Sequence, residues 1–425
     1  MADGHEHSAN PDAPPVAPNV RSHRALVLLL GALASFGPLS IDMYLPSFPR
    51  LAQVFGASEA SIQLTLSAYM IGVAGGQLVY GPLIDRFGRR RPLMLGLMLY
   101  IAASFGCAIA ASAEQLMLWR LLQALGGAAG IVCCRAIVRD LFEPREGARV
   151  LSMQILVMGA APILAPTLGG QMLLFADWWA IFVFLGLVGV ACLFAVHRML
   201  PETLPPQARA QRLALRRVIS DYWRLLRHRQ LIGFALTSGL GFAGMFAYIA
   251  GSPFVFVELY GVSPQRFSVL FGINAAGFIA ASQVNARLLR RFEPEAILPK
   301  ASMLYGVSSL VLVAVAATQW GGITALMIPL FATLCSLGMM APNATVLALA
   351  PFRREAGTAS ALTGMLQLGA GALSGALVGL FANGTALPMA GIILVWAVLS
   401  ALCLRMGMRA AHRALADQTT PASSN

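Results

Sequence analysis

Long apolar runs alternate with short polar segments along most of this 425-residue chain. Each run is roughly 20 residues long, the length at which an α-helix spans the hydrocarbon core of a bilayer. None of the runs shows the two-residue alternation typical of a membrane-spanning strand. The pattern therefore predicts an all-α membrane protein with twelve transmembrane helices. The runs are Ala25–Phe48, Ser61–Leu83, Pro92–Ala111, Gln115–Val138, Val150–Phe175, Trp178–His197, Leu231–Val257, Phe267–Leu289, Leu298–Ala317, Ile323–Ala348, Thr358–Phe381 and Leu387–Leu404.

The polar segment Pro201–Arg229 separates six apolar runs from the other six. The halves resemble each other at an offset of 210 residues, at which Gly159 matches Gly369 and Gly169 matches Gly379. Two six-helix repeats around a cavity at the midplane are the architecture of a secondary transporter. The basic linker fits either an amphipathic helix on the membrane surface or a solvated connection. We expect a disordered tail over residues 1–24, six-helix bundles over 25–200 and 230–408, a linker over 201–229 and a second tail over 409–425.

The positive charge of the chain is concentrated on one side of the predicted membrane. With the N-terminus in the cytoplasm, all but four of the 30 Arg and Lys residues fall on the cytoplasmic side; the four are Arg50, Arg120, Arg135 and Arg266. This asymmetry is the positive-inside rule, and it predicts that both termini are cytoplasmic. The net charge of +12 is therefore better explained by anionic lipids of the inner leaflet than by nucleic acid. A hydrophobic fraction of 58% with only 11% charged residues excludes a soluble domain.

Two charged residues lie inside apolar runs of the first half, where charge is costly and usually functional. Asp42 and Arg120 lie at similar heights, about 10 Å from the outer ends of their helices. Their helices could therefore bring them together, or bring both to one aqueous cavity. The corresponding positions of the second half carry Ala247 and Ala332, so we infer that the coupling chemistry belongs to the first half.

More than one role is open for each of these residues. Asp42 is either a proton carrier or an acid that caps a helix near the interface. Arg120 either orients that acid or satisfies backbone carbonyl groups as a structural fork. Tyr44 either lines a cavity or belongs to the interfacial aromatic belt. Pro46 and Pro49 follow Asp42 and should bend or end the first helix.

Two further segments have more glycine, proline and charge than plain connections or packing surfaces need. The loop after the second run contains Gly81, Asp85, Arg86, Gly88, Arg89 and Arg90. The fifth run contains Pro162, Pro166, Gly169 and Gly170, which imply a kink and close packing against a neighbour. Isolated polar residues in other runs, which either bond between helices or contact a substrate, include Gln154, Tyr248 and Asn274.

The sequence favours a transporter over an enzyme or a channel. It contains no G-x-S-x-G or H-E-x-x-H segment. The six cysteines lie inside apolar runs without metal-binding spacing, so we expect no metal and no cofactor other than a proton gradient. The charged residues do not form the repeated rings of a channel.

These segments resemble motifs of the major facilitator superfamily. Gly81-x-x-x-Asp85-Arg86-x-Gly88-Arg89-Arg90 is similar to its motif A, and Arg120-x-x-Gln123-x-x-Gly126 is similar to its motif B. Ala161 to Gly170 resembles the antiporter motif C, with Ala161 and Ala165 in place of two glycines. Asp42 to Pro46, together with Arg135 to Asp140, resembles the Bcr/CflA branch of drug:proton antiporters, which is linked to bicyclomycin and chloramphenicol resistance.

This resemblance implies a monomeric exporter of drugs in the bacterial inner membrane. Asp42 would be the protonation site, Arg120 would orient it, and Asp85 would hold the cytoplasmic gate against the start of the eleventh helix. Pro166 and Gly169 would shape the bend of the fifth helix and limit leak. A proton-coupled carrier of a small metabolite is the alternative on the same fold. The substrate cavity is expected to include Asp42, Tyr44, Gln123, Gln154, Tyr248 and Asn274.

Overall fold

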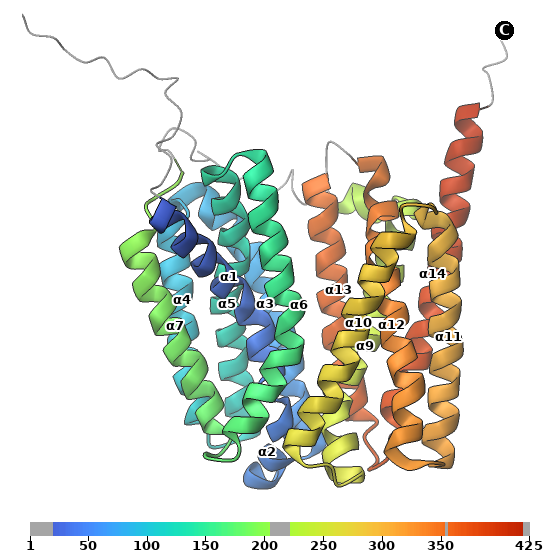
Figure 1. Cartoon of the computed structure of the whole chain (residues 1–425), viewed down its shortest axis with the longest axis horizontal. Coiled ribbons are helices and arrows are strands. Elements are labelled where there is room, and N and C mark those ends of the chain that lie inside the picture. Colours follow the sequence, from blue (N-terminus) through green and yellow to red (C-terminus); the bar gives the residue numbers. More distant parts are fainter. Residues whose placement is uncertain (1–19, 205–221, 353–355, 420–425) are drawn as a thin grey trace, which may run out of the picture.

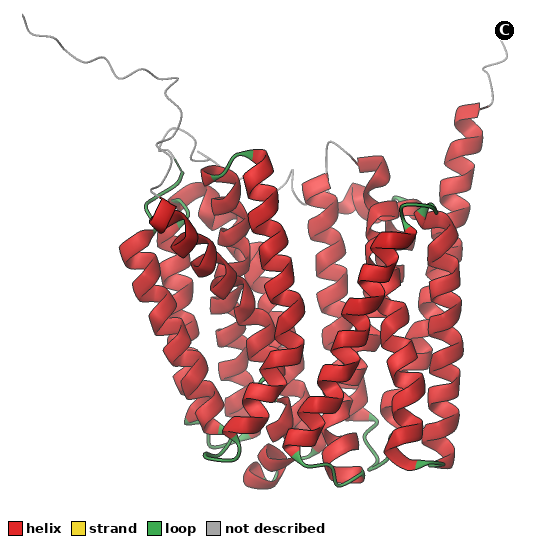
Figure 2. Cartoon of the chain, in the orientation of Figure 1, coloured by secondary structure: helices red, strands yellow, loops and turns green. Residues whose placement is uncertain are grey.

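The computed structural model describes residues 20–204, 222–352 and 356–419, and this part of the chain is helical without a strand (Figure 2). Eleven of its helices are long and apolar enough to cross a membrane, and α6 runs alongside them as the twelfth. Residues 1–19 of the tail predicted over 1–24, and residues 205–221 of the predicted linker, lie outside the described residues. Residues 20–24 of that tail are helical, since α1 begins at Val20. The expected all-α architecture is confirmed.

The helices form two bundles that stand side by side (Figure 1). The first bundle contains α1 (Val20–Asp42), α3 (Glu59–Phe87), α4 (Arg90–Ala108), α5 (Ala113–Leu141), α6 (Pro144–Met172) and α7 (Trp179–Met199). The second contains α9 (Arg229–Pro253), α10 (Pro264–Leu288), α11 (Pro294–Thr318), α12 (Gly322–Leu349), α13 (Ala356–Leu380) and α14 (Leu387–Thr419). Short helical elements η1 (Leu45–Ser47), α2 (Phe48–Phe55), η3 (Phe254–Leu259) and η4 (Ala350–Phe352) join or extend them.

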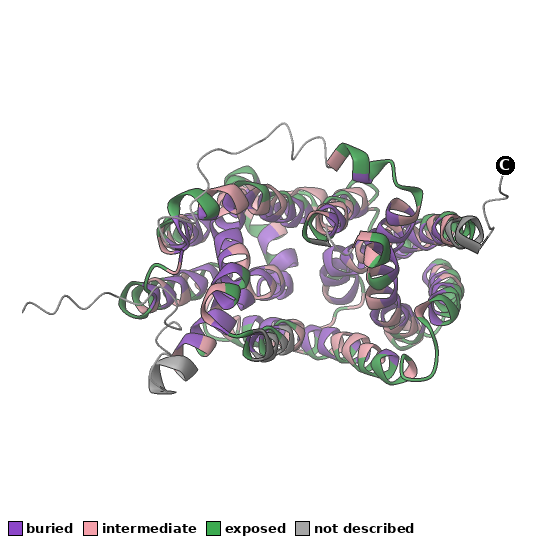
Figure 3. Ribbon diagram, turned by 90° about the horizontal axis from the view of Figure 1, so that it is seen from above, coloured by how far each residue is buried: buried purple, intermediate pink, exposed green. Residues whose placement is uncertain are grey.

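The start of α1 and the end of α14 lie at the same end of the molecule, which we call the terminal face (Figure 1). The other end, where α2 lies, is called the opposite face. Buried residues gather inside each bundle and exposed residues on its outer circumference (Figure 3). The bundles pack on each other through two pairs of helices, α3 with α13 and α6 with α10. The internal repeat relates one pair to the other, since α3 of the first bundle corresponds to α10 of the second, and α6 corresponds to α13.

Local chemistry explains where several helices begin and end. The Ser58 and Ser112 side chains accept hydrogen bonds from the backbone N–H three residues later and so cap the starts of α3 and α5. Gly56 ends α2 in the left-handed conformation, with a φ of 57°.

Two helix ends differ from the expected boundaries. α1 ends at Asp42 rather than at Phe48, because Pro46 has no N–H to continue the ladder, and a 3-10 turn follows. Pro49 lies in the first turn of α2, where no such N–H is needed. α14 continues to Thr419, so residues 409–419 are helical rather than a tail. Polar side chains do not stop a helix that has left the membrane.

An ion pair holds α2 to the connection between α6 and α7 at the opposite face. The Arg50 guanidinium lies 3.2 Å from the Asp177 carboxylate, which also accepts a hydrogen bond from the Trp178 backbone N–H at 2.8 Å. Partial burial opposes ionisation of Asp177, but these two donors hold the pKa of its carboxyl below the ordinary value.

Candidate transport site

The last turn of α1 ends in the interior of the molecule, and its carbonyl groups need partners there. A helix leaves its final four C=O groups without intrahelical donors. The Leu39 carbonyl accepts a bond from the Met43 N–H at 3.1 Å. The Ser40 carbonyl accepts one from the Arg120 guanidinium at 2.7 Å. A side chain from α5 therefore caps α1 two residues before Asp42.

Arg120 is fully buried within the first bundle. Besides the Ser40 carbonyl, its guanidinium donates to Gln123 Oε1 at 2.6 Å. Its central carbon lies 4.2 Å from the ring centroids of both Tyr44 and Tyr69. This buried cation is thus balanced by two oxygen dipoles and two aromatic faces, which attract a cation strongly when water is excluded.

Direct pairing of Arg120 with Asp42, one of the two arrangements that the sequence left open, is not present in this structure. Among the described residues, Arg120 forms no ion pair with an acid, and its polar contacts are those of a structural fork. The guanidinium acts on the acid only through the backbone of α1. The structural role that the sequence left open for Arg120 is therefore the one observed.

Tyr44 and Gln123 also lie inside the first bundle rather than on a substrate path. The Tyr44 hydroxyl lies 3.2 Å from Thr65 Oγ1, and Gln123 Nε2 donates to Ser104 Oγ at 2.8 Å. Both side chains are fully buried. Their expected place in the cavity is corrected, because their hydrogen-bonding groups are used to support Arg120 and to join α1, α3, α4 and α5.

Asp42 instead belongs to the seam between the bundles. Its residue is only 4% exposed, and among the described residues no group donates a hydrogen bond to its carboxyl. Across the seam, η1, which begins three residues after Asp42, contacts α9 and α10, and α9 carries the Tyr248 hydroxyl. Asn274 of α10 donates to that hydroxyl at 3.1 Å, while its own Oδ1 has no partner among the described residues. Tyr248 and Asn274 are therefore brought together in the second bundle, and the segment that follows Asp42 packs on the two helices that carry them.

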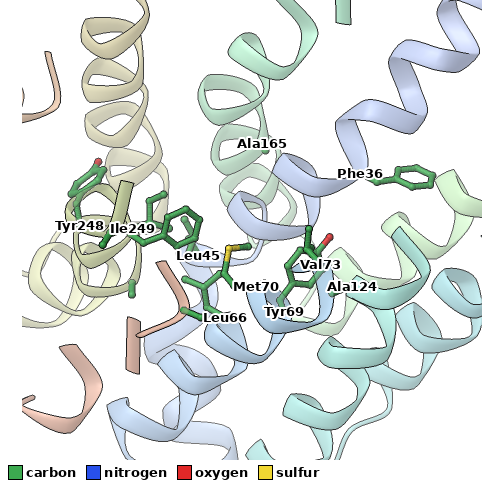
Figure 4. Close-up of a cluster of buried hydrophobic side chains, with 14 of the residues drawn as sticks. Phe36, Leu45, Leu66, Tyr69, Met70, Val73, Ala124, Ala165, Tyr248 and Ile249 are labelled. Atoms are coloured by element: carbon green, nitrogen blue, oxygen red, sulfur yellow. The ribbon is translucent and has the colours of Figure 1, made fainter. Parts of the chain in front are cut away.

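Apolar side chains surround this polar group. The Tyr248 ring is stacked on Phe271 with a centroid distance of 5.2 Å. Figure 4 shows Leu45 and Met70 of the first bundle beside Ile249 of the second, and all three are buried. They separate Tyr248 from the part of the first bundle that contains Tyr69. The site is thus a carboxyl, a phenol and an amide within an apolar layer.

The glycine and proline motif of α6 explains how the bundles approach here. A Cβ atom at Gly169 would overlap the Met43 carbonyl oxygen, next to Asp42. Ser268 of α10 donates to the Pro166 carbonyl at 2.6 Å, and a Cβ at Gly170 would lie 2.6 Å from the same Ser268 hydroxyl. Only glycine leaves room for these contacts.

Pro162 and Gln154 are the other two residues of α6 that the sequence singled out, and neither makes such a close approach among the described residues. Pro162 lies inside the helix, one turn before Pro166. Gln154 is buried, and its Nε2 has no partner among the described residues.

The charged segment that the sequence placed in a loop is mostly helical: Gly81, Asp85 and Arg86 belong to the end of α3, Arg90 begins α4, and only Gly88 and Arg89 lie between them. This segment ties the ends of four helices of the first bundle together at the terminal face. The buried Arg89 guanidinium lies 2.8 Å from the Asp85 carboxylate and 2.9 Å from that of Asp140 on α5. The carboxylate of Glu202, beyond α7, accepts bonds from the backbone N–H of Arg89 at 2.7 Å and of Arg90 at 3.3 Å. Within the part of the chain that the structure describes, Asp85 pairs with Arg89 and shows no contact with the start of α13, which the resemblance had implied.

The other residues of this charged segment have different contacts. Arg90 donates to the His197 carbonyl at the end of α7 at 2.7 Å. Gly88 has a φ of 87°, which favours glycine, and a Cβ there would overlap the Glu202 carboxylate. The Arg86 guanidinium lies over the Phe87 ring, and Gly81 faces open space. The sequence missed Glu202, since an acid at the start of a linker has no local signal of a distant partner.

The contacts between bundles are unequal at the two faces. Toward the opposite face, α13 lies close to α3. A Cβ at Gly375 would lie 2.9 Å from the Ser67 side chain, and a Cβ at Gly379 would lie 3.0 Å from the Gln63 side chain. Toward the terminal face, a Cβ at Gly81 of α3 or at Gly357 or Gly364 of α13 would meet no atom of another helix within 4 Å among the described residues. The bundles are thus closed at the opposite face and apart at the terminal face.

Two repeated bundles that meet around a buried acid at mid-depth define the class of secondary transporters. The sequence profile of the Major Facilitator Superfamily matches residues 28–375. The chain belongs to this superfamily, which is a family of transporters rather than of enzymes.

Individual relatives agree with this assignment. The chain is 38% identical to an uncharacterized MFS-type transporter, YdgK, of Bacillus subtilis, over 91% of this chain and 96% of the relative. It is 31% identical to a bicyclomycin resistance protein homolog of Haemophilus influenzae, over 85% and 91% of the two chains. These similarities confirm the resemblance to the Bcr/CflA branch.

The fold also matches solved structures. One is a bacterial homolog of the human lysosomal transporter Spinster in an inward-facing, unoccupied conformation, with a TM-score of 0.72 and 15% identity. The match covers 95% of this chain and all of that one.

Proposed function

We propose that this protein exports drugs across the bacterial inner membrane in exchange for protons. The observation that carries the proposal is Asp42, a buried carboxyl at the seam between two bundles with no hydrogen-bond donor among the described residues. A buried charge without a partner is costly, whereas a protonated carboxyl is not. An acid at a seam that opens alternately to the two sides therefore binds a proton on one side and releases it on the other.

The arrangement of the bundles supports alternating access. Their contacts gather toward the opposite face, and a rocking motion about the seam would transfer the opening from one face to the other. Asp42 lies at the end of α1, where the helix gives way to η1 and α2. Entry of one proton charge along a potential of 100 mV supplies about 2.3 kcal/mol to such a cycle.

The surroundings of Asp42 suit substrates that are mostly apolar with a few polar groups. The Tyr248 hydroxyl and the Asn274 amide offer both donors and acceptors, and the surrounding side chains are aromatic or aliphatic. Ligand sites generally combine an apolar lining with a small number of such polar groups. The bicyclomycin resistance relative supports antibiotics and other xenobiotics as the substrate class.

The charge distribution supports a cytoplasmic terminal face and binding of anionic lipids. Four arginines line a cavity of about 640 Å³ at the terminal face, between the start of α9 and the last part of α14. They form no ion pair with the described residues. Arginine clusters at this level attract the headgroups of anionic inner-leaflet lipids. The four arginines are Arg229, Arg405, Arg409 and Arg413. We propose that the protein works in this orientation as a monomer.

The test is drug-dependent proton release from acidified inside-out vesicles. Asp42→Asn keeps the size of the side chain but cannot carry a proton, so we expect drug addition to release no protons from vesicles that contain the variant. Asp177→Asn, at the opposite face, is the matched control and should retain release. Equal membrane abundance of both variants is checked by immunoblot. Undiminished release with Asp42→Asn would overturn the proposal. Uptake of a labelled metabolite, without drug-dependent release, would favour the alternative carrier.

A further inference from the structure

A second cavity lies on the seam at the opposite face, apart from the site around Asp42. Its volume is about 250 Å³. The first bundle lines it with Glu59 and Gln63 of α3, and the second with Phe254 and Glu258 of η3 and Met389 of α14. Because both bundles supply its wall, the cavity has this shape only while they meet at this face.

The polar lining of this cavity lacks a cation. Glu59 and Glu258 come from different bundles and repel each other electrostatically. Gln63 is only 1% exposed, and its Oε1 has no hydrogen-bond partner among the described residues. A buried amide oxygen without a donor carries a free-energy cost that a ligand can remove. Two carboxylates and one unpaired acceptor at the same cavity are complementary to a positively charged donor of hydrogen bonds.

The size and apolar part of the lining indicate which kind of cation fits. The cavity is far larger than a metal ion and slightly smaller than the usual range for drug-sized ligands. Phe254 and Met389 offer an aromatic ring and a thioether to alkyl groups and to a cationic centre. We propose that this cavity binds a small primary alkylammonium ion, whose N–H groups bond Glu59, Glu258 and Gln63.

Binding at this place stabilises one arrangement of the bundles. A ligand shifts an equilibrium toward the conformation to which it binds more tightly. An alkylammonium ion held by acids of both bundles therefore favours the arrangement that is closed at the opposite face. This consequence for the transport cycle rests on the proposed alternation of access, whereas the binding itself does not.

The experiment measures binding of n-butylammonium chloride to the purified full-length protein in lipid nanodiscs by calorimetry, at constant ionic strength set with sodium chloride. We expect saturable binding. Glu59→Gln and Glu258→Gln should each weaken it about fivefold, because each removes one unit charge, and a charge about 4 Å from the ion attracts it by about 1 kcal/mol in water-like surroundings. Gln63→Leu should weaken binding as well. Glu114→Gln, exposed at the start of α5, is the matched surface control and should bind as the wild type does. Asp42→Asn tests the central site and should retain saturable binding.

Each other outcome overturns the proposal. Equal weakening by Glu114→Gln would mean diffuse attraction by surface charge. Loss of binding in Asp42→Asn would assign the ion to the central site. Binding of tetramethylammonium as tightly as n-butylammonium would exclude N–H donation, and competition by sodium at similar concentrations would indicate an inorganic ion. Thermal melts confirm that the variants are folded. No transport is measured, so failure of proton antiport leaves this result unaffected.

Discussion

Replacement of Arg120 by methionine tests the capping of α1 most directly. Methionine has a similar length and fills much of the same space, but it has no donor and no charge. The variant therefore leaves the Ser40 carbonyl and Gln123 Oε1 without the bonds that they accept from Arg120 at 2.7 and 2.6 Å. The end of α1, which presents Asp42 at the seam, loses its anchor to α5.

The expected magnitude follows from these two bonds. Interhelical hydrogen bonds in a membrane protein average about 0.6 kcal/mol, so two bonds set a lower bound of about 1.2 kcal/mol. A buried acceptor that is left without a donor costs about 1–3 kcal/mol, which raises the expected loss of stability to about 3 kcal/mol. For a cooperative unit the size of the first bundle, this corresponds to a melting temperature lowered by roughly 6–12 °C.

A thermal melt of the purified protein in detergent measures this shift. Arg266→Met removes an exposed arginine and should melt within about 1–2 °C of the wild type, since surface changes rarely exceed about 0.5 kcal/mol. Arg120→Lys keeps one charged donor and should fall between the two. Methionine also removes the cost of burying a cation. A melting temperature of Arg120→Met equal to or above that of Arg266→Met would mean that this cost exceeds the capping gain, and it would refute the reasoning.

Two other predictions concern contacts at each end of the first bundle. Gly169→Ala places a methyl group on the Met43 carbonyl and should cost about 1–3 kcal/mol through overpacking, visible as a lower melting temperature, whereas Gly364→Ala meets open space and should not destabilise. Arg89→Met removes the guanidinium that bonds Asp85 and Asp140 and should cost about 1.5–3 kcal/mol, because Asp140 keeps Arg139 and Thr203 as partners and Asp85 is exposed, whereas Arg86→Met should have little effect. Equal melting of either variant and its control would contradict the corresponding contact.

Much of the fold could be predicted because hydropathy is a property of each residue and helix length is set by the bilayer. The break after Asp42 was predictable for a similar reason, since Pro46 cannot donate a backbone bond in any environment. The close approach of α6 was predictable from Gly169 and Gly170, although not the neighbours that they face. The end of α14 at Thr419 could not be predicted, because it lies outside the membrane, where no hydrocarbon edge limits the helix.

The partners of the polar residues could not be predicted in the same way. A position in the sequence gives the depth of a side chain, and Asp42 and Arg120 were placed at similar depths, but it does not give the rotation of each helix about its axis. That rotation turns Arg120 inward to the Ser40 carbonyl and leaves Asp42 at the seam, where the following η1 contacts α9 and α10 of the other bundle. It also encloses Gln123 with Ser104 instead of exposing it to a substrate.

The sequence by itself determined the number and type of the elements, their repetition and the presence of an acid within an apolar helix, because each of these depends on local chemistry. Only the tertiary structure decided that Arg120 supports the backbone of α1, that Asp42 faces the second bundle and that the bundles meet toward the opposite face. The physical reason is that these outcomes depend on the simultaneous packing of many helices, where the space left by residues such as Gly169 and Gly379 selects which surfaces touch.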